Sequence, residues 1–155
     1  MIRLATSADV PRLIELGSLS LKNGPYKGKI ADVPEQAKLL ALTLLESGKV
    51  LVLVNPENQI VGLLALAFFP HYYTGEKTAA EVMWYVLPEW RKSLGLETIG
   101  LFRAAEREAR AAGCTTIQFT APTEEIARLY EKAGLTALEV AYYKELRPLL
   151  EPISA

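Results

Sequence analysis

The sequence has few of the side chains that build disulfide frameworks and metal centres, because its 155 residues include one cysteine and one histidine. A single cysteine, Cys114, excludes an intrachain disulfide and suits a reducing compartment. Cys114 and His71 are unrelated in spacing and match no zinc-ligand pattern. The G-x-S-x-G motif of serine hydrolases is missing as well. We therefore expect no metal ion, no serine-hydrolase chemistry and a buried structural role for Cys114.

The sequence also has no large excess of positive or negative charge and no long apolar run. The formal net charge is -1, and the lysines form no long basic tract of the kind that binds nucleic acid. No apolar run reaches the length of a membrane span, and Met1–Leu4 lacks the apolar core of a signal peptide. These absences predict a cytoplasmic protein that binds neither nucleic acid nor a membrane. The lysines at residues 22–29 are a local exception, which we interpret as a solvated loop.

The composition that is present is that of a globular protein. Hydrophobic residues make up 50% of the chain and charged residues 23%, which excludes a disordered chain. A length of 155 residues predicts one domain with a sizeable core. We place this domain at residues 1–146 and expect residues 147–155, which include two prolines, to form a loose tail.

The stretch from residue 79 to residue 113 organises the rest of the chain. Glu81–Leu87 is rich in β-branched and aromatic residues and stops at Pro88, which predicts a buried central strand with a defined end. An amphipathic helix follows and ends at Gly113, with apolar positions at Leu94, Ile99, Leu101, Phe102, Ala105 and Ala109. We expect this helix to pack on the sheet.

The turn between this strand and this helix is basic and reads EWRKSLG at residues 89–95. The first amides of a helix have no intrahelical acceptor and lie at the positive end of the helix dipole, so they are suited to phosphate oxygens. Arg91 and Lys92 add positive charge, and Ser93 adds a hydroxyl group. The turn therefore predicts a pyrophosphate site, and an ordinary turn with two solvated cations is the alternative.

Hydrophobic periodicity and turn residues predict the other elements. With the central strand and its helix they give the order β-α-α-β-β-β-α-β-α-β. We expect them at Ile2–Ala5, from Val10, from Pro34 to Gly48, at Val50–Val54, Ile60–Phe69 and Thr115–Thr120, from Pro122 to Gly134, and at Thr136–Leu146. The strand at Thr115–Thr120 follows a crossover helix and should lie parallel to the central strand.

Three passages, in this order, resemble the GNAT family of N-acetyltransferases over nearly the whole of residues 2–146. IRLAT, followed by Asp9, resembles the opening of the family, and VLPEWR at residues 86–91 resembles its strand end and basic turn. ARLYEKAGL at residues 127–135 is the most specific and resembles the helix A-x-x-L-Y-E-K-x-G-F. The resemblance implies an α/β (α+β) fold: a GNAT-like mixed, mostly antiparallel sheet of six to seven strands, with helices on both faces and a central V-shaped splay.

The resemblance also implies acetyl-CoA as the acetyl donor. Its pantetheine arm would lie in the splay, where Met83, Trp84, Tyr85 and Val86 face Ile117, Gln118 and Phe119. Its pyrophosphate would bind the turn formed by Arg91, Lys92, Ser93, Leu94, Gly95 and Leu96. The sequence departs from the family in three ways: leucine at positions 94 and 96, where small residues are usual; Gly95 at a shifted position; and Glu124 in place of a common asparagine.

Three side chains are candidates for acid–base chemistry. The resemblance places the hydroxyl group of Tyr130 near the cofactor sulfur, where it would protonate the leaving thiolate; the alternative is an aromatic residue that fills a helix–sheet interface. Glu81 is a candidate base, since a carboxylate in a cleft can have a raised pKa, and a solvated charge is the alternative. His71 could do the same work near neutral pH, although a single loop histidine is more often incidental.

Two functions of different classes follow. The first is an N-acetyltransferase that acts on a primary amine of a small molecule or a protein, with the acceptor pocket lined by Tyr26, Tyr72 and Tyr73. The second is a catalytically silent GNAT-like binding or structural module within a larger assembly, as in the GNAT-like proteins of bacteriophages, which the sequence also resembles. Tyr130 and the basic turn favour the first function, and the leucines of the turn favour the second. A homodimer is compatible with either.

Overall fold

The structure is a computed structural model that describes residues 1–93 and 95–147. The chain folds into two compact units, Met1–Thr120 and Ala121–Ala155. Leu94 and most of the predicted tail, residues 148–155, lie outside the described residues. A membrane-spanning helix would need a longer apolar stretch than any helix of the described residues provides.

The first unit is built on a sheet with the strand order β1-β2-β3-β4-β5. Neighbouring strands are antiparallel except β4 and β5, which are parallel, as the crossover through a helix predicted. A hairpin turn at residues 55–59 joins the second and third strands, as predicted. The strands are β1 (Ile2–Leu4), β2 (Lys49–Val54), β3 (Ile60–Pro70), β4 (Lys77–Val86) and β5 (Thr116–Gln118).

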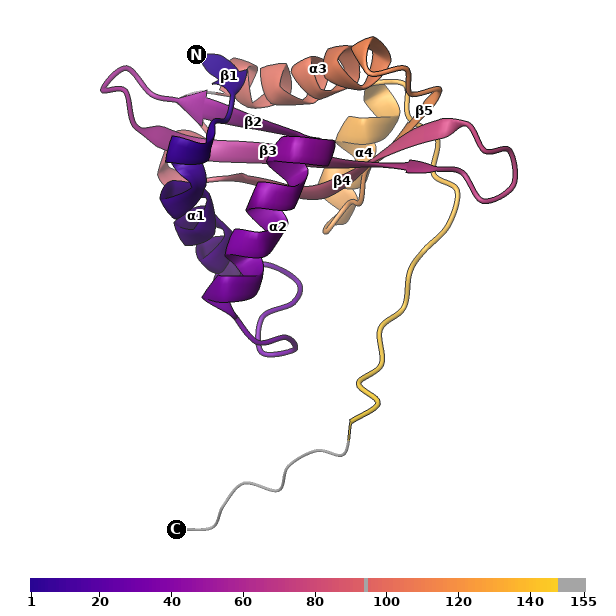
Figure 1. Ribbon diagram of the computed structural model, residues 1–155, viewed down its shortest axis with the longest axis horizontal. Coiled ribbons are helices and arrows are strands. Elements are labelled where there is room, and N and C mark those ends of the chain that lie inside the picture. Colours follow the sequence, from indigo (N-terminus) through magenta and orange to yellow (C-terminus); the bar gives the residue numbers. More distant parts are fainter. Residues whose placement is uncertain (94, 148–155) are drawn as a thin grey trace. The chain divides into compact units, whose positions relative to one another are not determined.

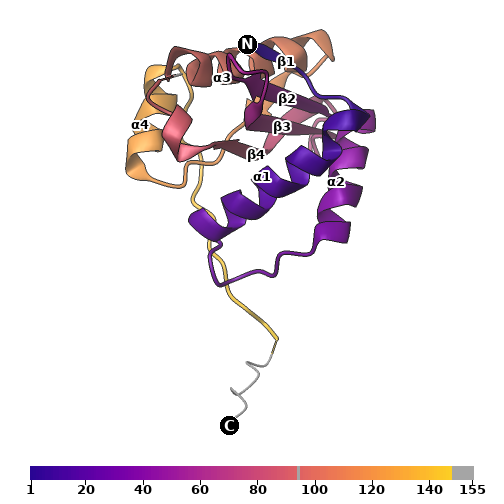
Figure 2. The same cartoon turned by 90° about the vertical axis from the view of Figure 1, so that its left-hand side faces the viewer.

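Helices cover both faces of this sheet (Figures 1 and 2). α1 (Val10–Asn23) and α2 (Pro34–Ser47) lie on one face, and α3 (Gly95–Ala111) lies on the other. Short 3-10 turns, η1 (Ser7–Asp9) and η2 (Pro88–Trp90), precede α1 and α3. The arrangement confirms the prediction of helices on both faces.

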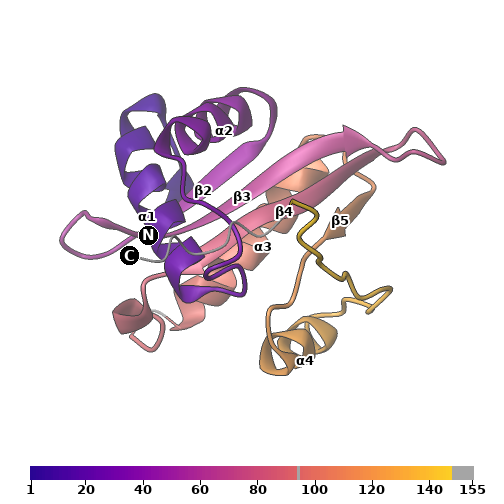
Figure 3. The same cartoon turned by 90° about the horizontal axis from the view of Figure 1, so that it is seen from below.

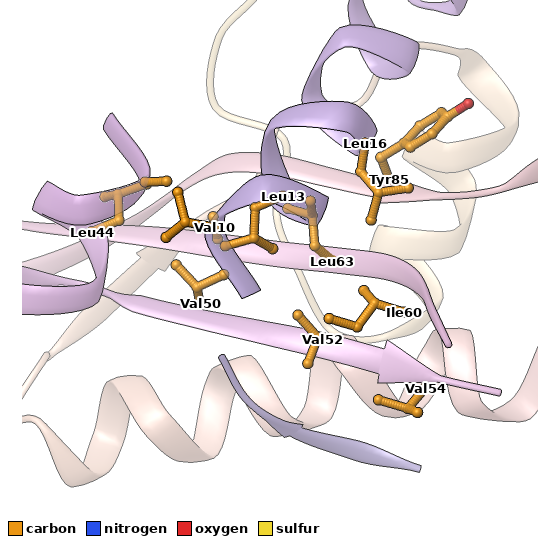
Figure 4. Packing of buried hydrophobic residues seen from close by; sticks show 12 residues of the cluster. Val10, Leu13, Leu16, Leu44, Val50, Val52, Val54, Ile60, Leu63 and Tyr85 are labelled. Carbon is orange, nitrogen blue, oxygen red and sulfur yellow. The ribbon is translucent and has the colours of Figure 1, made fainter. Parts of the chain in front are cut away.

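Each face carries its own apolar cluster. On the side of α1 and α2, Leu13 and Leu16 pack with Leu63 and Tyr85 of the sheet (Figure 4). On the side of α3, residues that include Leu53, Leu64, Leu66, Leu101 and Ala105 form the second cluster. Cys114 is half-buried against this second cluster, where burial raises the pKa of its thiol and the charge of Lys77 opposes the rise. The two clusters thus hold the sheet between α1 and α2 on one side and α3 on the other, with β3 as its middle strand.

A half-buried ion pair holds β1 to η1, the turn that precedes α1. Two oxygens of Asp9 accept hydrogen bonds from the Arg3 guanidinium at 2.8 and 3.1 Å, and one of them also accepts from the Thr6 amide at 2.8 Å. The side chain of Asp9 is only 12% exposed. The Arg3 hydrogen bonds are the main cause that lowers the pKa of Asp9 to about 2. These contacts explain why arginine and aspartate occur together in the opening passage.

Replacing Asp9 with asparagine is expected to destabilise the fold by about 1–3 kcal/mol, because Arg3 loses a charged hydrogen-bond partner. In the wild type this contribution is complete above the unfolded pKa of about 3.9 and disappears as the pH falls through about 2, the folded pKa. Denaturant titrations at pH 7 and pH 2 measure both effects. Glu15→Gln is the control, since Glu15 pairs with Arg12 but is 63% exposed. Equal losses in the two variants would contradict the role of Asp9.

The second unit contains one helix in its described residues, α4 (Glu124–Lys132). The Thr123 hydroxyl caps this helix by accepting a hydrogen bond from the Ile126 amide at 3.3 Å. Gly134, with a φ of 93°, follows the helix in the left-handed region. The helix and its glycine stop agree with the prediction.

The predicted closing strand is wrong for this structure. Residues 136–146 are assigned to no strand, so the sheet of the described residues has five strands instead of the expected six to seven. Apolar side chains of this segment face solvent, since Leu138 is 86% and Tyr142 is 95% exposed. The sequence correctly shows β propensity, but propensity measures fit to a pleated surface, and a strand also needs a neighbouring strand for its backbone hydrogen bonds.

Candidate active site

The parallel strands β4 and β5 separate partway along the sheet (Figure 3). Their pairing comprises Thr78 with Thr116, Ala79 with Ile117 and Ala80 with Gln118. β4 then continues to Val86 without β5 as a neighbour. The pairing ends two residues later on β5 than the predicted splay, because Ile117 and Gln118, which were expected to line it, are still paired with β4.

A bulge in β4 lies at the start of this splay. Glu81 pairs with Leu66 and Met83 pairs with Ala65, so Val82 is an extra residue between two regular stretches. Val82 and Met83 consequently line the same cavity on the side of α1 and α2. Glu81, opposite Leu66, belongs to the face covered by α3. The bulge therefore places a carboxylate and an apolar pair on opposite faces of one short segment.

The Glu81 carboxylate lies at the point of separation. Its Oε2 accepts a hydrogen bond from the backbone amide of Thr120, two residues beyond the end of β5, at 3.1 Å. Burial raises the pKa of Glu81, and the hydrogen bond from Thr120 partly opposes this rise. A half-buried carboxyl group with a raised pKa can accept a proton from a neighbouring group. Sequence reasoning identified Glu81, but Thr120 was missed because its amide carries no sequence signal.

An aromatic cluster lies between the splay and α3. The ring of Trp84 lies 6.1 Å from that of Phe102 and 6.2 Å from that of Phe119, and the last two rings are 4.8 Å apart. Trp84, Phe102 and Phe119 come from β4, α3 and the segment after β5. The Trp84 side chain therefore has aromatic neighbours on the α3 side.

β4 ends with Tyr85 and Val86, and Arg91 of the following turn contacts both residues. Tyr85 and Val86 are buried on opposite faces, and the Tyr85 hydroxyl accepts a hydrogen bond from Asn23 at 3.3 Å. Arg91 turns back over this end: its Nε donates to the Val86 carbonyl at 2.8 Å, and its guanidinium carbon lies 5.5 Å from the centre of the Tyr85 ring. Arg91 thus fixes the turn to the strand, and its two terminal nitrogens are the atoms suited to an anion.

The basic turn is compact and open to solvent. Arg91 donates its amide to Pro88 at 3.3 Å, and Gly95, the first residue of α3, donates its amide to Lys92 at 3.4 Å. The side chains of Lys92 and Ser93 are exposed, and Leu96 is 88% exposed. A Cβ atom on Gly95 would meet nothing within 4 Å. Leu96 therefore does not cover the start of α3, and the predicted site residue Leu94 lies outside the described residues.

His71 lies far from this turn. It sits in the β3–β4 hairpin, where its ring stacks on Tyr72 at 4.8 Å and its Nδ1 accepts from the Tyr73 amide at 3.2 Å. The hairpin precedes β4 and the turn follows it, and the 10 residues of β4 span about 33 Å at about 3.3 Å per residue. Tyr72 and Tyr73 are 89% and 84% exposed. His71 and these tyrosines thus lie at the opposite end of β4 from the turn, and their role at an acceptor pocket stays a prediction.

Tyr130 belongs to the second unit. It lies in α4, of which it is the buried residue, and its carbonyl accepts hydrogen bonds from the amides of Ala133 and Leu135, both at 3.0 Å. The burial of Tyr130 is compatible with a packing role and also with a catalytic role that needs a fixed orientation of the side chain. The catalytic role of Tyr130 stays a prediction.

Two cavities occur in the first unit. The larger, of about 640 Å³, opens beside η2 and the β2–β3 hairpin; it is lined by Arg3, Asp9, Arg12, Asn58, Gln59, Ile60, Val61, Leu87, Glu89 and Trp90. The smaller, of about 70 Å³, is apolar and lies between the sheet and the two helices α1 and α2. Within residues 1–93 and 95–147, no group of three or more histidine, cysteine, aspartate or glutamate side chains is placed to hold a metal ion.

The fold is that of known acetyltransferases. An acetyltransferase from Trypanosoma brucei is 21% identical, with a TM-score of 0.71 over 94% of this chain and 99% of that one. A glucosamine-6-phosphate N-acetyltransferase from Arabidopsis thaliana is 15% identical, with a TM-score of 0.71 over 95% and 98% of the two chains. An aminoglycoside antibiotic 6'-N-acetyltransferase from Acinetobacter haemolyticus is 19% identical, with a TM-score of 0.68 over 96% and 99%.

Identities this low establish a common fold and nothing about the acceptor. No curated protein sequence matches the chain. The family model of the acetyltransferase (GNAT) family matches residues 20–135, which is most of the chain and includes the splay, the basic turn and α4. The chain belongs to the GNAT acetyltransferase family.

Proposed function

We propose that the protein transfers an acetyl group from acetyl-CoA to a primary amine of a small molecule or a protein. The observation that carries this proposal is the end of the β4–β5 pairing at Ala80 and Gln118, with the Glu81 carboxylate held beside it by the Thr120 amide. An open strand edge offers backbone groups to an amide-containing arm, and a carboxyl group with a raised pKa is available for proton transfer. A cytoplasmic location and a homodimer stay predictions from the sequence.

The residues of the first unit fit a CoA thioester. The start of α3 is open around Gly95, and Lys92, Ser93 and the terminal nitrogens of Arg91 are cationic or polar groups near it in sequence. Helix amides with adjacent cations are suited to a pyrophosphate. The splay leads from this end of β4 back towards Glu81. Phosphate groups at the turn would therefore direct the rest of the donor along β4.

The donor supplies an activated acyl group, and the chain has to manage the protons. The amine nitrogen forms a bond to the acyl carbon while the carbon–sulfur bond breaks, which requires a neutral amine. Glu81 accepts the proton that the amine releases, directly or through water. Tyr130 donates a proton to the departing thiolate. Backbone amides of β4 near the splay polarise the carbonyl oxygen, where negative charge develops.

Isothermal titration of the protein with acetyl-CoA tests the proposal directly. We expect saturable one-to-one binding, followed by release of free thiol when primary amines are added. The titration is repeated at higher salt, because binding through phosphate contacts weakens with ionic strength. No heat change with acetyl-CoA and no thiol release across a panel of amines would contradict the transferase function.

Replacing Lys92 with alanine is expected to weaken acetyl-CoA binding by about tenfold, since a charged hydrogen bond to phosphate contributes about 1.5 kcal/mol or more. The same titration measures the change. Lys38→Ala is a matched control, because Lys38 is an exposed lysine of α2 outside the turn. Equal affinities of the Lys92 and Lys38 variants would show that the turn does not bind the pyrophosphate.

A catalytically silent binding module is the second candidate. It is favoured by the position of Arg91, whose Nε donates a hydrogen bond to the Val86 carbonyl. The main role of this side chain is then to hold the turn and not to bind an anion. If the silent module is correct, the Arg91→Ala variant will lose stability, and neither it nor the wild type will bind acetyl-CoA. The two functions thus differ in the first titration described above.

A further inference from the structure

The smaller cavity of the first unit has a wholly apolar lining. Its volume is about 70 Å³, and five elements contribute to it. An apolar cavity of this kind stays dry and favours an apolar occupant, since a buried hydroxyl or charge would lose its hydrogen bonds to water. The lining residues are Leu13, Ile14 and Gly17 of α1, Ala37, Leu40, Ala41 and Leu44 of α2, and Val50, Leu63, Ala65, Val82 and Met83 of the sheet.

The cavity is closed at one end and reaches the surface at the other. Leu13, Leu44 and Leu63 are buried, whereas Leu40 is 45% and Val82 is 39% exposed. Figure 4 shows Leu13 and Leu63 pointing toward one another between α1 and the sheet. A ligand can therefore enter past Leu40 and Val82 and end against these buried leucines.

Gly17 keeps part of this space empty. It lies inside α1, where glycine is less favourable than alanine. No steric reason requires glycine, because a Cβ atom there would meet only the Met83 methyl group, at 3.9 Å, which is an ordinary contact. The missing side chain leaves room in the cavity at a cost in helix stability. A residue that lowers stability and enlarges a cavity is expected where the cavity is used.

The cavity also lies next to the chemistry. Val82, the bulge residue of β4, and Met83 line it, and both directly follow Glu81. The bulge puts these two side chains on the face opposite Glu81, at the point where β4 leaves β5. A molecule whose apolar part enters past Val82 would leave its polar end at the mouth of the cavity, beside the residue that directly follows Glu81.

We propose that this cavity binds a short aliphatic group of the acceptor, so that the substrates are aliphatic primary amines. The inference rests on the proposed function, because it assigns the acceptor of that reaction. An engineered apolar cavity of about 150 Å³ holds benzene. A volume of about 70 Å³ is about half of that and suits a chain of about three or four carbon atoms. Hydroxylated acceptors such as amino sugars are disfavoured, since the lining offers no hydrogen-bond partner.

Titration with straight-chain primary amines from ethylamine to hexylamine, without acetyl-CoA, tests the cavity alone. We expect the affinity to rise about fourfold for each added methylene group until the cavity is full, and then to level off. Pentylamine should bind more tightly than 5-amino-1-pentanol, in which a hydroxyl group replaces the terminal hydrogen. An affinity independent of chain length, or equal binding of these two amines, would overturn the proposal.

Gly17→Ala separates filling of the cavity from unfolding. The added methyl group should raise the melting temperature through better helix propensity and shift the preferred chain to one carbon fewer. Leu39→Ala is the control, since Leu39 is an exposed leucine of α2 that does not line the cavity. An unchanged chain-length preference in Gly17→Ala would overturn the proposal.

The same amines are then assayed with acetyl-CoA. Acetylation with the chain-length preference seen in binding supports both the cavity and the transferase function. Chain-length-dependent binding without acetylation supports an aliphatic site and contradicts the transferase function. Acetylation without any chain-length preference supports the transferase function and overturns the proposal that the cavity binds the acceptor.

Discussion

Replacing Glu81 with glutamine is expected to lower kcat about a hundredfold and to leave acetyl-CoA binding unchanged. Glutamine preserves the acceptor for the Thr120 amide, because its side-chain oxygen can replace Oε2, but it cannot take a proton from the amine. The fold is therefore retained while proton transfer is lost. Steady-state kinetics with a fixed amine acceptor measures kcat, and calorimetry measures the affinity for acetyl-CoA.

The pH dependence of the rate provides a second measurement on the same variant. Burial raises the pKa of Glu81, so the wild-type rate should fall as the pH drops through this raised value and the carboxyl group becomes protonated. The Glu81→Gln variant should lack this limb of the profile. Glu76→Gln, in the exposed β3–β4 hairpin, is the control and should behave as the wild type. Identical rates and profiles for wild type and Glu81→Gln would exclude Glu81 as the base.

Tyr130→Phe is expected to reduce kcat by about a hundredfold or more, because the substitution removes the proton donor for the thiolate and keeps the ring. The melting temperature should change little, as one hydroxyl group contributes about 1 kcal/mol to stability. Tyr142→Phe is the matched control, since Tyr142 belongs to the same unit and is 95% exposed. If Tyr130→Phe turns over at the wild-type rate, Tyr130 has only a packing role and the acid has to be sought elsewhere.

Local signals in the sequence located the helices well. Pro34 and Gly48 delimit α2, and Gly113 follows α3 with a φ of 86°, in the left-handed region that glycine favours. These signals work because the conformations that start or stop a helix are determined by the residues themselves. The parallel pairing of β4 and β5 was also predictable, since a helix connects the two strands.

Features that depend on distant residues were not predictable in the same way. The segment at residues 136–146 has the composition of a strand, but whether it pairs is decided by a neighbour and not by its own sequence. The bulge at Val82 likewise follows from the register between β3 and β4, and nothing in the run of residues 81–86 marks it. β4 is also longer at its start than predicted, from Lys77 onward, because β3 supplies partners there.

In the candidate site, too, some features were predictable from the sequence and others were not. Glu81 was found because it starts the predicted strand on the side of the expected cleft, and the turn was found because Arg91 and Lys92 precede a helix. Two hydrogen bonds were not found from the sequence: the one from Arg91 to the Val86 carbonyl and the one from the Thr120 amide to Glu81. Both depend on where the strands end in the folded protein. His71 was a candidate for its chemistry alone, and the length of β4 separates it from the turn.

The extra residue in β4 puts the two halves of this strand out of phase. Trp84 and Val86 face α3 while Tyr85 faces α1, and this holds only because Val82 shifts the alternation by one residue. If Val82 instead paired regularly with Ala65, each later residue of β4 would change faces, and the indole would turn towards α1 and the phenol towards α3. The bulge at Val82 thus decides which layer receives each of the two rings.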